Sequence, residues 1–337
     1  MSELFRSCRV AQYCRNARYI AIALLLTWLG GCEQQSNVTV LTLAHNLDTG
    51  HTVHKAMLLM GERLEEYSDG QLRIAIYPGG QLGSERENLE LLQIGSLAMT
   101  KVSASPLEGF VPEMGLFSLP YIFTGREHHL RVLDSPIGRE LLASLKVARL
   151  YGLGYYDAGS RSFYTSDRPV NSPADLHGMK IRVMKSQTSV RMVAELGGSP
   201  TPISLGEIYT ALQQGVVDGA ENNPPSFYRL RHYEATRFYS LDEHTFVPDV
   251  LVMSKRVWDD LTTTQQQWLA RAVDDSVAYQ RELWQTETEA SLEAVAAAGV
   301  TVSYPDKEPF RAAVKAMKQG YQGTRTGEIL QAIEQME

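Results

Sequence analysis

Apolar and polar positions alternate in several short segments of this chain and recur every three or four residues in the segments between them. Residues 38–44 and 71–77 are rich in alternating apolar or β-branched side chains, which predicts two strands. Between them, residues 53–67 carry apolar side chains at spacings of three and four. This spacing predicts a helix, which Gly70 ends.

The same order of strand, helix and strand continues along the chain. Ser84 and Glu87 form the S-x-x-E pattern of a capping box, so a helix should begin there, and residues 97–102 predict a strand. A helix over about 125–145 and a strand near 150–156 follow. The repeated order predicts an α/β fold with a mainly parallel sheet.

The second half of the chain repeats this order. Strands are predicted over 161–165 and 179–184, and the next helix should begin at Ser186 or Ser189 and end at the glycines 197–198. The remaining predicted elements are a helix from a second capping box at 204–207, a strand beginning at 216 and a strand over 246–253 that Pro248 interrupts.

A much longer helix is predicted near the end of the chain. Thr262 and Gln265 form a cap, and helical sequence continues to about Ala298, where Gly299 follows. Such a helix would be about 54 Å long at ~1.5 Å per residue, which exceeds one compact domain. Leucines do not repeat in heptads, so we expect a helix shared by two domains and not a coiled coil.

The first residues have the pattern of an exported protein. Four arginines in residues 1–18 precede the apolar run 19–29, which is too short to span a bilayer. The run ends in Leu-Gly-Gly-Cys, which resembles a bacterial lipobox with Cys32 as the lipidated residue. We therefore expect a signal peptide over 1–31 and a lipidated N-terminus and linker over 32–37. Ordinary cleavage near the same point, with Cys32 unmodified, is the alternative.

Cysteine content and charge exclude several classes of function. The cysteines are Cys8, Cys14 and Cys32, so only Cys32 would remain after cleavage, and no disulfide or thiolate site is expected in the folded part. Cleavage would reduce the basic residues from 32 to 28 and the acidic residues from 39 to 38, giving a formal charge of −10. The chain has no basic stripe, so we do not expect nucleic acid as a partner.

Two arginines lie in predicted strands beside apolar neighbours, Arg161 and Arg182. A guanidinium is costly to bury unless an anion meets it, and it can grip a carboxylate with two parallel hydrogen bonds. From these residues alone, two readings remain open. Each arginine either pairs with an acid of this chain, such as Asp157, Asp167 or Asp218, or binds a carboxylate that arrives from outside.

Motifs of catalysis and metal binding do not occur. The chain has neither the G-x-S-x-G pattern of a nucleophile elbow nor H-E-x-x-H, and no phosphate-binding lysine pattern follows the glycines 79–80. Histidines three apart at a helix start, as at 51 and 54, are more typical of surface positions, and the pair 128–129 could suggest a metal only together with further ligands. We therefore expect no catalysis, no metal and no cofactor. An exported hydrolase is a remote alternative, and a structural or adhesive role fits the pattern less well.

Four stretches, taken together and in this order, resemble the solute-binding proteins of tripartite ATP-independent periplasmic (TRAP) transporters. They are Gly80-Gln81-Leu82-Gly83, Leu119-Pro120-Tyr121, Asp175-Leu176-His177-Gly178-Met179-Lys180-Ile181-Arg182 and the segment from Ala211 to Asn222. The resemblance covers about residues 38–333.

This resemblance implies a two-lobed α/β fold of the class II-like periplasmic-binding-protein type, with the long helix spanning both lobes. Lobe I would comprise 38–158 and about 248–288, and lobe II 159–247 and about 289–337. It also implies a periplasmic protein that does no chemistry. With the lipobox-like sequence, we expect the protein to be tethered to a membrane only through a lipid on Cys32. Its partners would be a small organic acid and the membrane subunits of a TRAP transporter.

The resemblance also implies roles for three residues of lobe II. Arg182, in the K-I-R motif, would hold the carboxylate of the ligand, Arg161 would assist, and Asn222 would also bond the carboxylate. Residues 221–227 and 241–245 are similar to the sugar-acid-binding branch of the family. The expected ligand is therefore a hexuronate such as D-glucuronate or D-galacturonate; a four-carbon dicarboxylate or a keto acid is the alternative.

Further candidate ligand residues lie in segments that follow predicted strands or flank the glycine motif, where α/β proteins place ligand contacts. They are His45, Asn46, Glu85, Lys101, His244 and Asp249. These donors and acceptors suit several hydroxyl groups. A dicarboxylate would require a second cation in lobe I, where Lys101 is the candidate and Glu85 would oppose it.

Overall fold

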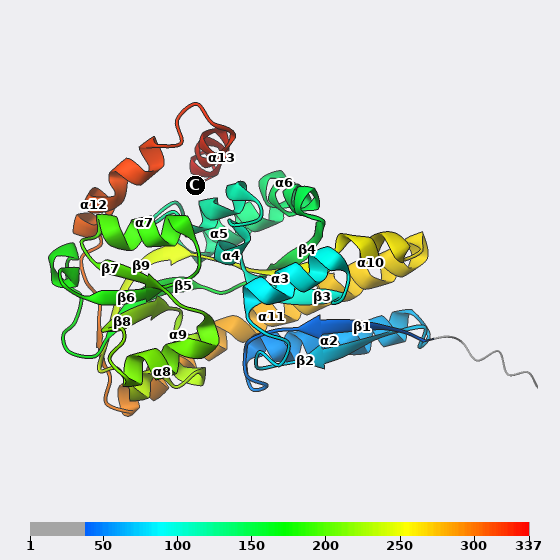
Figure 1. Ribbon diagram of the computed structural model, residues 1–337, viewed down its shortest axis with the longest axis horizontal. Coiled ribbons are helices and arrows are strands. Elements are labelled where there is room, and N and C mark those ends of the chain that lie inside the picture. Colours follow the sequence, from blue (N-terminus) through cyan, green and yellow to red (C-terminus); the bar gives the residue numbers. More distant parts are fainter. Residues whose placement is uncertain (1–37, 337) are drawn as a thin grey trace, which may run out of the picture. The chain divides into compact units, whose positions relative to one another are not determined.

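Two β-sheets organise the part of the chain that the computed structural model describes, residues 38–336 (Figure 1). Residues from Thr39 onward form one compact unit. The strand order is β2-β1-β3-β10-β4 in the first sheet and β11-β9-β5-β8-β6-β7 in the second. The predicted two-lobed α/β fold is confirmed. The predicted signal peptide and Cys32 lie outside the described residues.

The first sheet forms where the sequence alternates. Its strands are β1 (Thr39–Ala44), β2 (Leu72–Tyr77), β3 (Met99–Ser103), β4 (Leu150–Tyr156) and β10 (Asp249–Ser254). The prediction of a mainly parallel sheet is confirmed for all of these strands except β10. Strand β1 is parallel to β2 and β3, but β10 lies antiparallel between β3 and β4. The sheet is mixed because β10 enters it directly from a strand of the second sheet.

The second sheet contains three strands that the sequence analysis did not predict, at residues 199–202, 238–246 and 301–303. Its strands are β5 (Ser160–Thr165), β6 (Lys180–Val183), β7 (Ser199–Pro202), β8 (Gly219–Asn222), β9 (Phe238–Phe246) and β11 (Thr301–Ser303). Strand β9 includes Asp242, Glu243 and His244, and such polar residues hide the usual strand pattern. Pro248 separates β9 from β10, where one interrupted strand was predicted.

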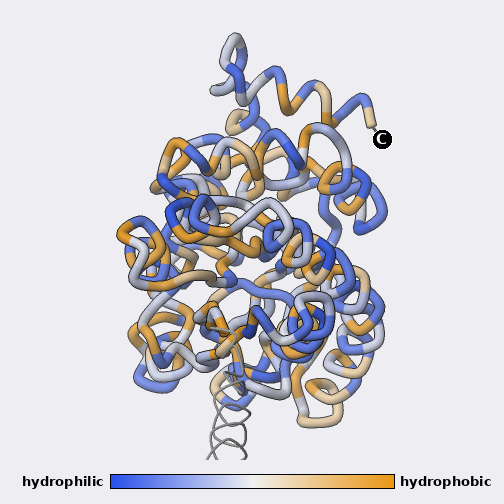
Figure 2. The backbone as a smooth tube through the Cα atoms, turned by 90° about the vertical axis from the view of Figure 1, so that its right-hand side faces the viewer, coloured by the Kyte–Doolittle hydropathy of each residue, from blue (hydrophilic) through white to orange (hydrophobic). Residues whose placement is uncertain are grey.

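Helices cover both sheets (Figure 1). They are α2 (Thr52–Tyr67), α3 (Glu85–Ile94), α4 (Ala104–Leu107), α5 (Arg126–Asp134), α6 (Pro136–Ser144), α7 (Gln187–Glu195), α8 (Ile208–Gln213), α9 (Pro224–Arg229), α10 (Lys255–Asp260), α11 (Thr263–Ala297), α12 (Glu308–Gln319) and α13 (Arg325–Glu334). Hydrophobic and hydrophilic positions alternate along the helices near the C-terminus (Figure 2). No helix among residues 38–336 is both long and apolar enough to cross a membrane.

Capping residues explain where several helices begin. Ser84 and Glu87 form the predicted capping box of α3, and Ser186, the first of two candidates, caps α7. The single helix predicted over 125–145 is instead two helices, α5 and α6. Ser135 caps α6, and Pro136 has no N–H with which to continue the preceding helix.

The long helix is confirmed as α11, 35 residues with the predicted cap at Thr262. It packs against α2 and β4 of the first lobe and against α9 of the second. The chain first passes from one sheet to the other at residues 157–159, and the middle of α11 holds this segment by hydrogen bonds. There the amide of Gln280 donates to Asp157 O (2.7 Å) and accepts from Asp157 N (2.8 Å).

Two positions beside this crossover show how closely the helix approaches it. Gly159 has a φ of 56°, and a Cβ there would lie 2.9 Å from Nε1 of Trp284 on α11. Only glycine fits both the conformation and the space. The second crossover, between β9 and β10, consists of residues 247–248.

We expect Gln280→Leu to lower the free energy of unfolding by about 2–4 kcal/mol, because leucine keeps the volume but leaves Asp157 N–H and C=O buried without partners. Chemical denaturation measures this. The matched control is Gln267→Leu, at an exposed position of the same helix, which should change stability by less than ~0.5 kcal/mol. Equal effects of the two substitutions would contradict the role assigned to Gln280.

Candidate functional site

Two adjoining cavities lie between the sheets, with empty volumes of about 350 and 390 Å³. Both are lined by Glu85 of the first lobe and by Arg182, Met184 and Leu205 of the second, so they form one space, here called the cleft. Small-molecule sites lie preferentially in clefts between domains, which is the position of this space.

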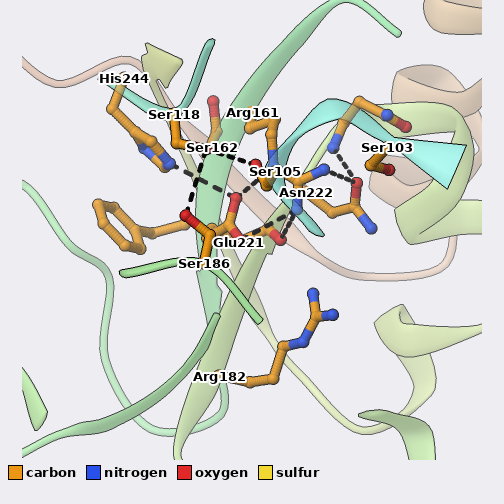
Figure 3. Close-up of polar contacts among 12 residues, drawn as sticks. Ser103, Ser105, Ser118, Arg161, Ser162, Arg182, Ser186, Glu221, Asn222 and His244 are labelled. Carbon is orange, nitrogen blue, oxygen red and sulfur yellow. Dashed lines mark hydrogen bonds and ion pairs between the residues drawn. The ribbon is translucent and has the colours of Figure 1, made fainter. Parts of the chain in front are cut away.

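Arg182 lies at the centre of the cleft without an anionic partner. It is on β6, where Ile181 and Val183 are buried in the apolar core. Its Nε donates to Ile203 O (2.8 Å), while Nη1 is buried and has no hydrogen-bond partner within residues 38–336. No carboxylate of the described chain forms an ion pair with it. Figure 3 shows the guanidinium of Arg182 apart from the dashed contacts that join the neighbouring residues.

The environment of Arg182 disfavours its charge. Burial, followed by the positive charge of nearby Arg161, lowers the pKa of Arg182, although Glu221 partly opposes this. An arginine nevertheless stays protonated in proteins. A buried, charged guanidinium with a free N–H is a site for an anion from outside the chain.

Arg161, in contrast, is neutralised within the chain. Its Nε pairs with Glu221 Oε2, its Nη2 donates to Glu221 Oε1 (3.0 Å) and to Glu221 O (2.7 Å), and its Nη1 donates to Asn222 Oδ1 (2.7 Å). The acids considered from sequence do not pair with it. Asp157 pairs with Arg126 (2.6 Å), and Asp218 accepts from Lys180 N (2.7 Å). Arg161 still lines the cleft.

Strand pairing brings these residues together. Strand β8 lies between β5 and β6, so Asn222 at its end is next to both arginine-bearing strands. Asn222 Oδ1 accepts from Arg161 Nη1 and from Asn223 N (2.9 Å). With its oxygen so occupied, the amide nitrogen of Asn222 is the group left to donate to a molecule in the cleft.

Glu221, the partner of Arg161, belongs to a buried network of ionisable groups with His244 and Asp242. His244 Nδ1 lies 2.8 Å from Asp242 Oδ2, and its Nε2 lies 3.6 Å from Glu221 Oε2. Burial alone would lower the pKa of His244, but Asp242 and Glu221 raise it to about 9. Burial alone would raise the pKa of Glu221, but Arg161 and His244 lower it to about 2. His244 is thus a buried cation that does not line the cleft.

Three candidates of the first lobe form a second charged group in the cleft. Lys101 Nζ lies 2.9 Å from Asp249 Oδ1 and 3.5 Å from Glu85 Oε1. Burial alone would lower the pKa of Lys101, but Asp249 and Glu85 raise it above its usual value. We call these three residues the acidic triad, because their net charge is −1.

The two candidates that follow β1 differ in their positions. Asn46 lines the cleft, and its buried Oδ1 has no partner in the described chain, while its Nδ2 donates to Gly83 O (2.9 Å). His45 does not line the cleft. Its Nδ1 accepts from Leu47 N (3.2 Å), so Nε2 carries the proton and donates to His54 Nδ1 (2.9 Å). Burial, followed by Lys101 and His54, lowers the pKa of His45 to about 3.

The cleft has lining residues that the sequence analysis did not name as ligand-binding candidates. These are Ser103, Met184, Leu205, Asn223 and Ser226, among others. Asn223 and Ser226 lie in the segment 221–227, whose similarity to the sugar-acid-binding branch was the available signal, and the proline pair 224–225 between them marks a helix start. Nothing in the local pattern distinguishes the others from ordinary core or loop residues.

The two walls of the cleft offer complementary groups. On the second lobe, the buried charges of Arg182, Arg161, Glu221, His244 and Asp242 sum to +1, and the unengaged groups are donors. On the first lobe, the triad carries −1 and the unengaged groups are acceptors. This arrangement suits a small molecule with a carboxylate at one end and hydroxyl groups at the other. Residues 38–336 contain no group of three or more His, Cys, Asp or Glu side chains placed for a metal ion.

Comparison with known proteins gives consistent matches. The family model described as bacterial extracellular solute-binding protein, family 7, matches residues 43–323. The uncharacterized protein YiiZ of Salmonella typhimurium is 40% identical over 284 residues, which is 84% of this chain and 86% of that protein.

Two solved structures are similar over most of the chain. A TRAP periplasmic solute-binding protein from Bradyrhizobium sp. BTAi1, in complex with α/β-D-galacturonate, is 43% identical and has a TM-score of 0.86, covering 88% of this chain and 100% of its own. One from Pseudomonas putida F1, with bound D-glucuronate, is 36% identical and has a TM-score of 0.85, covering 88% and 97%.

The buried pair of His244 and Glu221 predicts a pH dependence of stability. The folded pKa of His244, about 9, lies above its ordinary value of 6.5, so its contribution is fully present below pH 6.5 and is lost as pH rises through about 9. The contribution is on the order of 3 kcal/mol. Thermal denaturation between pH 6.5 and 9 should therefore show that the wild type loses stability relative to His244→Gln. Other buried histidines, such as His45, have lowered pKa values and contribute equally to both proteins.

The control for this prediction is His177→Gln, which removes an exposed histidine. It should leave the pH profile unchanged. A His244→Gln variant with the same pH profile as the wild type between pH 6.5 and 9 would show that His244 is not a buried cation.

Proposed function

Because the chain belongs to family 7 of the bacterial extracellular solute-binding proteins, the binding proteins of TRAP transporters, we propose that it captures a hexuronate in the cleft. The ligand is of the D-glucuronate or D-galacturonate type, and the protein delivers it to the membrane subunits of the transporter. The observation that carries this proposal is the buried guanidinium of Arg182, which has a free Nη1 and no acid of the described chain beside it.

The carboxylate of the ligand binds to Arg182. The guanidinium presents N–H groups in one plane, so it can make two parallel, charge-assisted bonds to one carboxylate. The amide nitrogen of Asn222 supplies a third donor. Arg161 lines the same space, but it donates its hydrogen bonds to Glu221 and Asn222. It therefore holds these two side chains in place and attracts the ligand carboxylate by its charge, without a direct hydrogen bond.

The hydroxyl groups of the ligand bind to the first lobe. Asn46 Oδ1, Glu85 and Asp249 offer acceptors there, and a plain aliphatic acid would leave them unpaired at a cost of about 1–3 kcal/mol each. The two structural relatives described above were solved with hexuronates, which supports this ligand class. A four-carbon dicarboxylate fits less well, because the one buried lysine of the first lobe is already paired with two acids.

Capture occurs by closure of the two lobes. Each lobe contributes one wall, so neither wall alone can surround the ligand. The chain crosses between the sheets at residues 157–159 and 247–248, and small backbone rotations there would move one lobe against the other. The closed form is the one that the membrane subunits recognise.

We further propose that the protein is periplasmic, like the TRAP solute-binding proteins it resembles, and that it carries a lipid anchor on Cys32. The supporting observation is the Leu-Gly-Gly-Cys sequence after the apolar run of residues 19–29. The family members do no chemistry on the ligand, and we propose the same for this chain.

The ligand proposal predicts that D-glucuronate or D-galacturonate, at about 100 times its dissociation constant, adds about 2.7 kcal/mol to the free energy of unfolding. D-Glucuronamide, which has the same shape without the charge, should have little effect. Arg182→Met should weaken binding at least about 100-fold, because a buried charge pair is lost. Its ligand-free stability should not fall, because the substitution removes an unpaired buried cation. Calorimetry measures both quantities.

The matched control is Arg237→Met, which removes an exposed arginine of the same lobe and should leave affinity unchanged. Stabilisation by succinate or malate alone would show that the ligand class is wrong. Full hexuronate affinity in the Arg182→Met variant would show that the carboxylate binds elsewhere.

The anchor predicts incorporation of labelled palmitate when the full chain is expressed in a Gram-negative host. Cys32→Ala should abolish the label completely, since Cys32 is the only attachment site. Cys14→Ala is the control and should retain the label, because residue 14 belongs to the leader. Label that persists without Cys32, or none on the wild type, would overturn this proposal.

A further inference from the structure

We propose that the acidic triad makes this protein selective for sugar acids with a single carboxylate, so that it binds hexuronates and rejects hexarates. A hexarate is the diacid in which the aldehyde carbon of a hexuronate is also a carboxylate. The inference rests on the proposed function, because it concerns the selectivity of the same cleft.

The triad holds its excess negative charge inside the cleft. Lys101 is only 2% exposed and lies within ion-pair distance of Asp249 and Glu85. Ser103 adds its N–H to Glu85 Oε1 (3.0 Å) and its hydroxyl to Asp249 Oδ1 (3.1 Å). These contacts fix both carboxylates on the first-lobe wall, and both residues line the cleft.

Each acid has one oxygen left for the ligand. Lys101 and Ser103 engage Oε1 of Glu85 and Oδ1 of Asp249, whereas Oε2 of Glu85 and Oδ2 of Asp249 receive no hydrogen bond from residues 38–336. A hydroxyl group can donate to such an oxygen. An ionised carboxylate has no proton to donate and brings a like charge into a buried space.

No cation compensates a second carboxylate in this part of the cleft. Lys101 is outnumbered by its two acids. Two further basic residues, Arg86 and Lys185, line the same cavity as Arg182. Both are exposed to solvent. Arg86 is also paired with Glu90 (3.1 Å). Water and salt screen such exposed charges, so they cannot offset a buried repulsion.

The test compares three ligands by isothermal titration calorimetry on the mature protein at pH 7. D-Glucuronate tests the proposed function, and the open-chain acids D-gluconate and D-glucarate differ in one added carboxylate. We expect D-glucarate to bind roughly 100-fold or more weakly than D-gluconate, because like charges in a buried site are strongly unfavourable. Glu85→Gln should narrow this ratio roughly 10-fold, because the triad becomes neutral while its shape is kept.

Two further variants complete the design. Asp249→Asn removes the other excess charge and should narrow the ratio in the same direction, which keeps the test valid if one variant folds poorly. Glu62→Gln removes an exposed acid of the first lobe and should leave the ratio unchanged.

The possible outcomes separate the two proposals. If D-glucuronate binds but D-glucarate binds as tightly as D-gluconate, the selectivity proposal is wrong and the proposed function stands. If D-gluconate binds as weakly as D-glucarate, shape and not charge determines selectivity, and the proposal is also wrong. If succinate binds and none of the three sugar acids does, both the selectivity proposal and the proposed function are wrong.

Discussion

A buried arginine without an anionic partner is the constraint on which the cleft depends. Arg182 has lost most of its water, its Nη1 has no partner in the described chain, and its pKa is lowered by burial. Taking such a charge out of water costs several kcal/mol unless an anion meets it. The carboxylate of the ligand would supply that anion, so part of the energy of binding is the relief of a cost already present in the ligand-free protein.

The contrast with Arg161 shows why one arginine is free and the other is not. Arg161 adjoins Glu221 across the β5–β8 pair, and the carboxylate of Glu221 is held in turn by His244. The second lobe therefore keeps a net charge of +1, which matches one carboxylate. The triad of the first lobe keeps −1, which accepts hydroxyl protons. The proposed closure of the lobes would bring these walls together. Helix α11 packs against elements of both lobes beside the crossover at Asp157.

Much of the fold could be predicted because local signals agree with tertiary structure. Capping residues at Ser84 and Thr262 start helices where expected, and α11 extends over nearly the predicted length. Strand β9 was not predicted, because Asp242, Glu243 and His244 serve the buried charge network and break the apolar pattern. The mixed order of the first sheet was not predicted either, since no local pattern reveals that β10 arrives from the other lobe.

The sequence analysis named most of the candidates that line the cleft, but it did not predict the ion pairs that these residues form. Seven of the nine candidates line the cleft, while His45 and His244 lie behind it. Sequence alone could not show that Glu221, and not an aspartate, pairs with Arg161, because that contact depends on strand register across about 60 residues. Nor could it show that Lys101 is shared between Glu85 and Asp249, which lie far apart along the chain.

A crystal structure of the complex with D-glucuronate would test the central claim most directly. In that complex, the ligand carboxylate should lie within hydrogen-bond distance of Nη1 of Arg182, with the hydroxyl groups facing Glu85 and Asp249. A complex in which the carboxylate meets Lys101, or in which Nη1 of Arg182 remains without a partner, would contradict that claim.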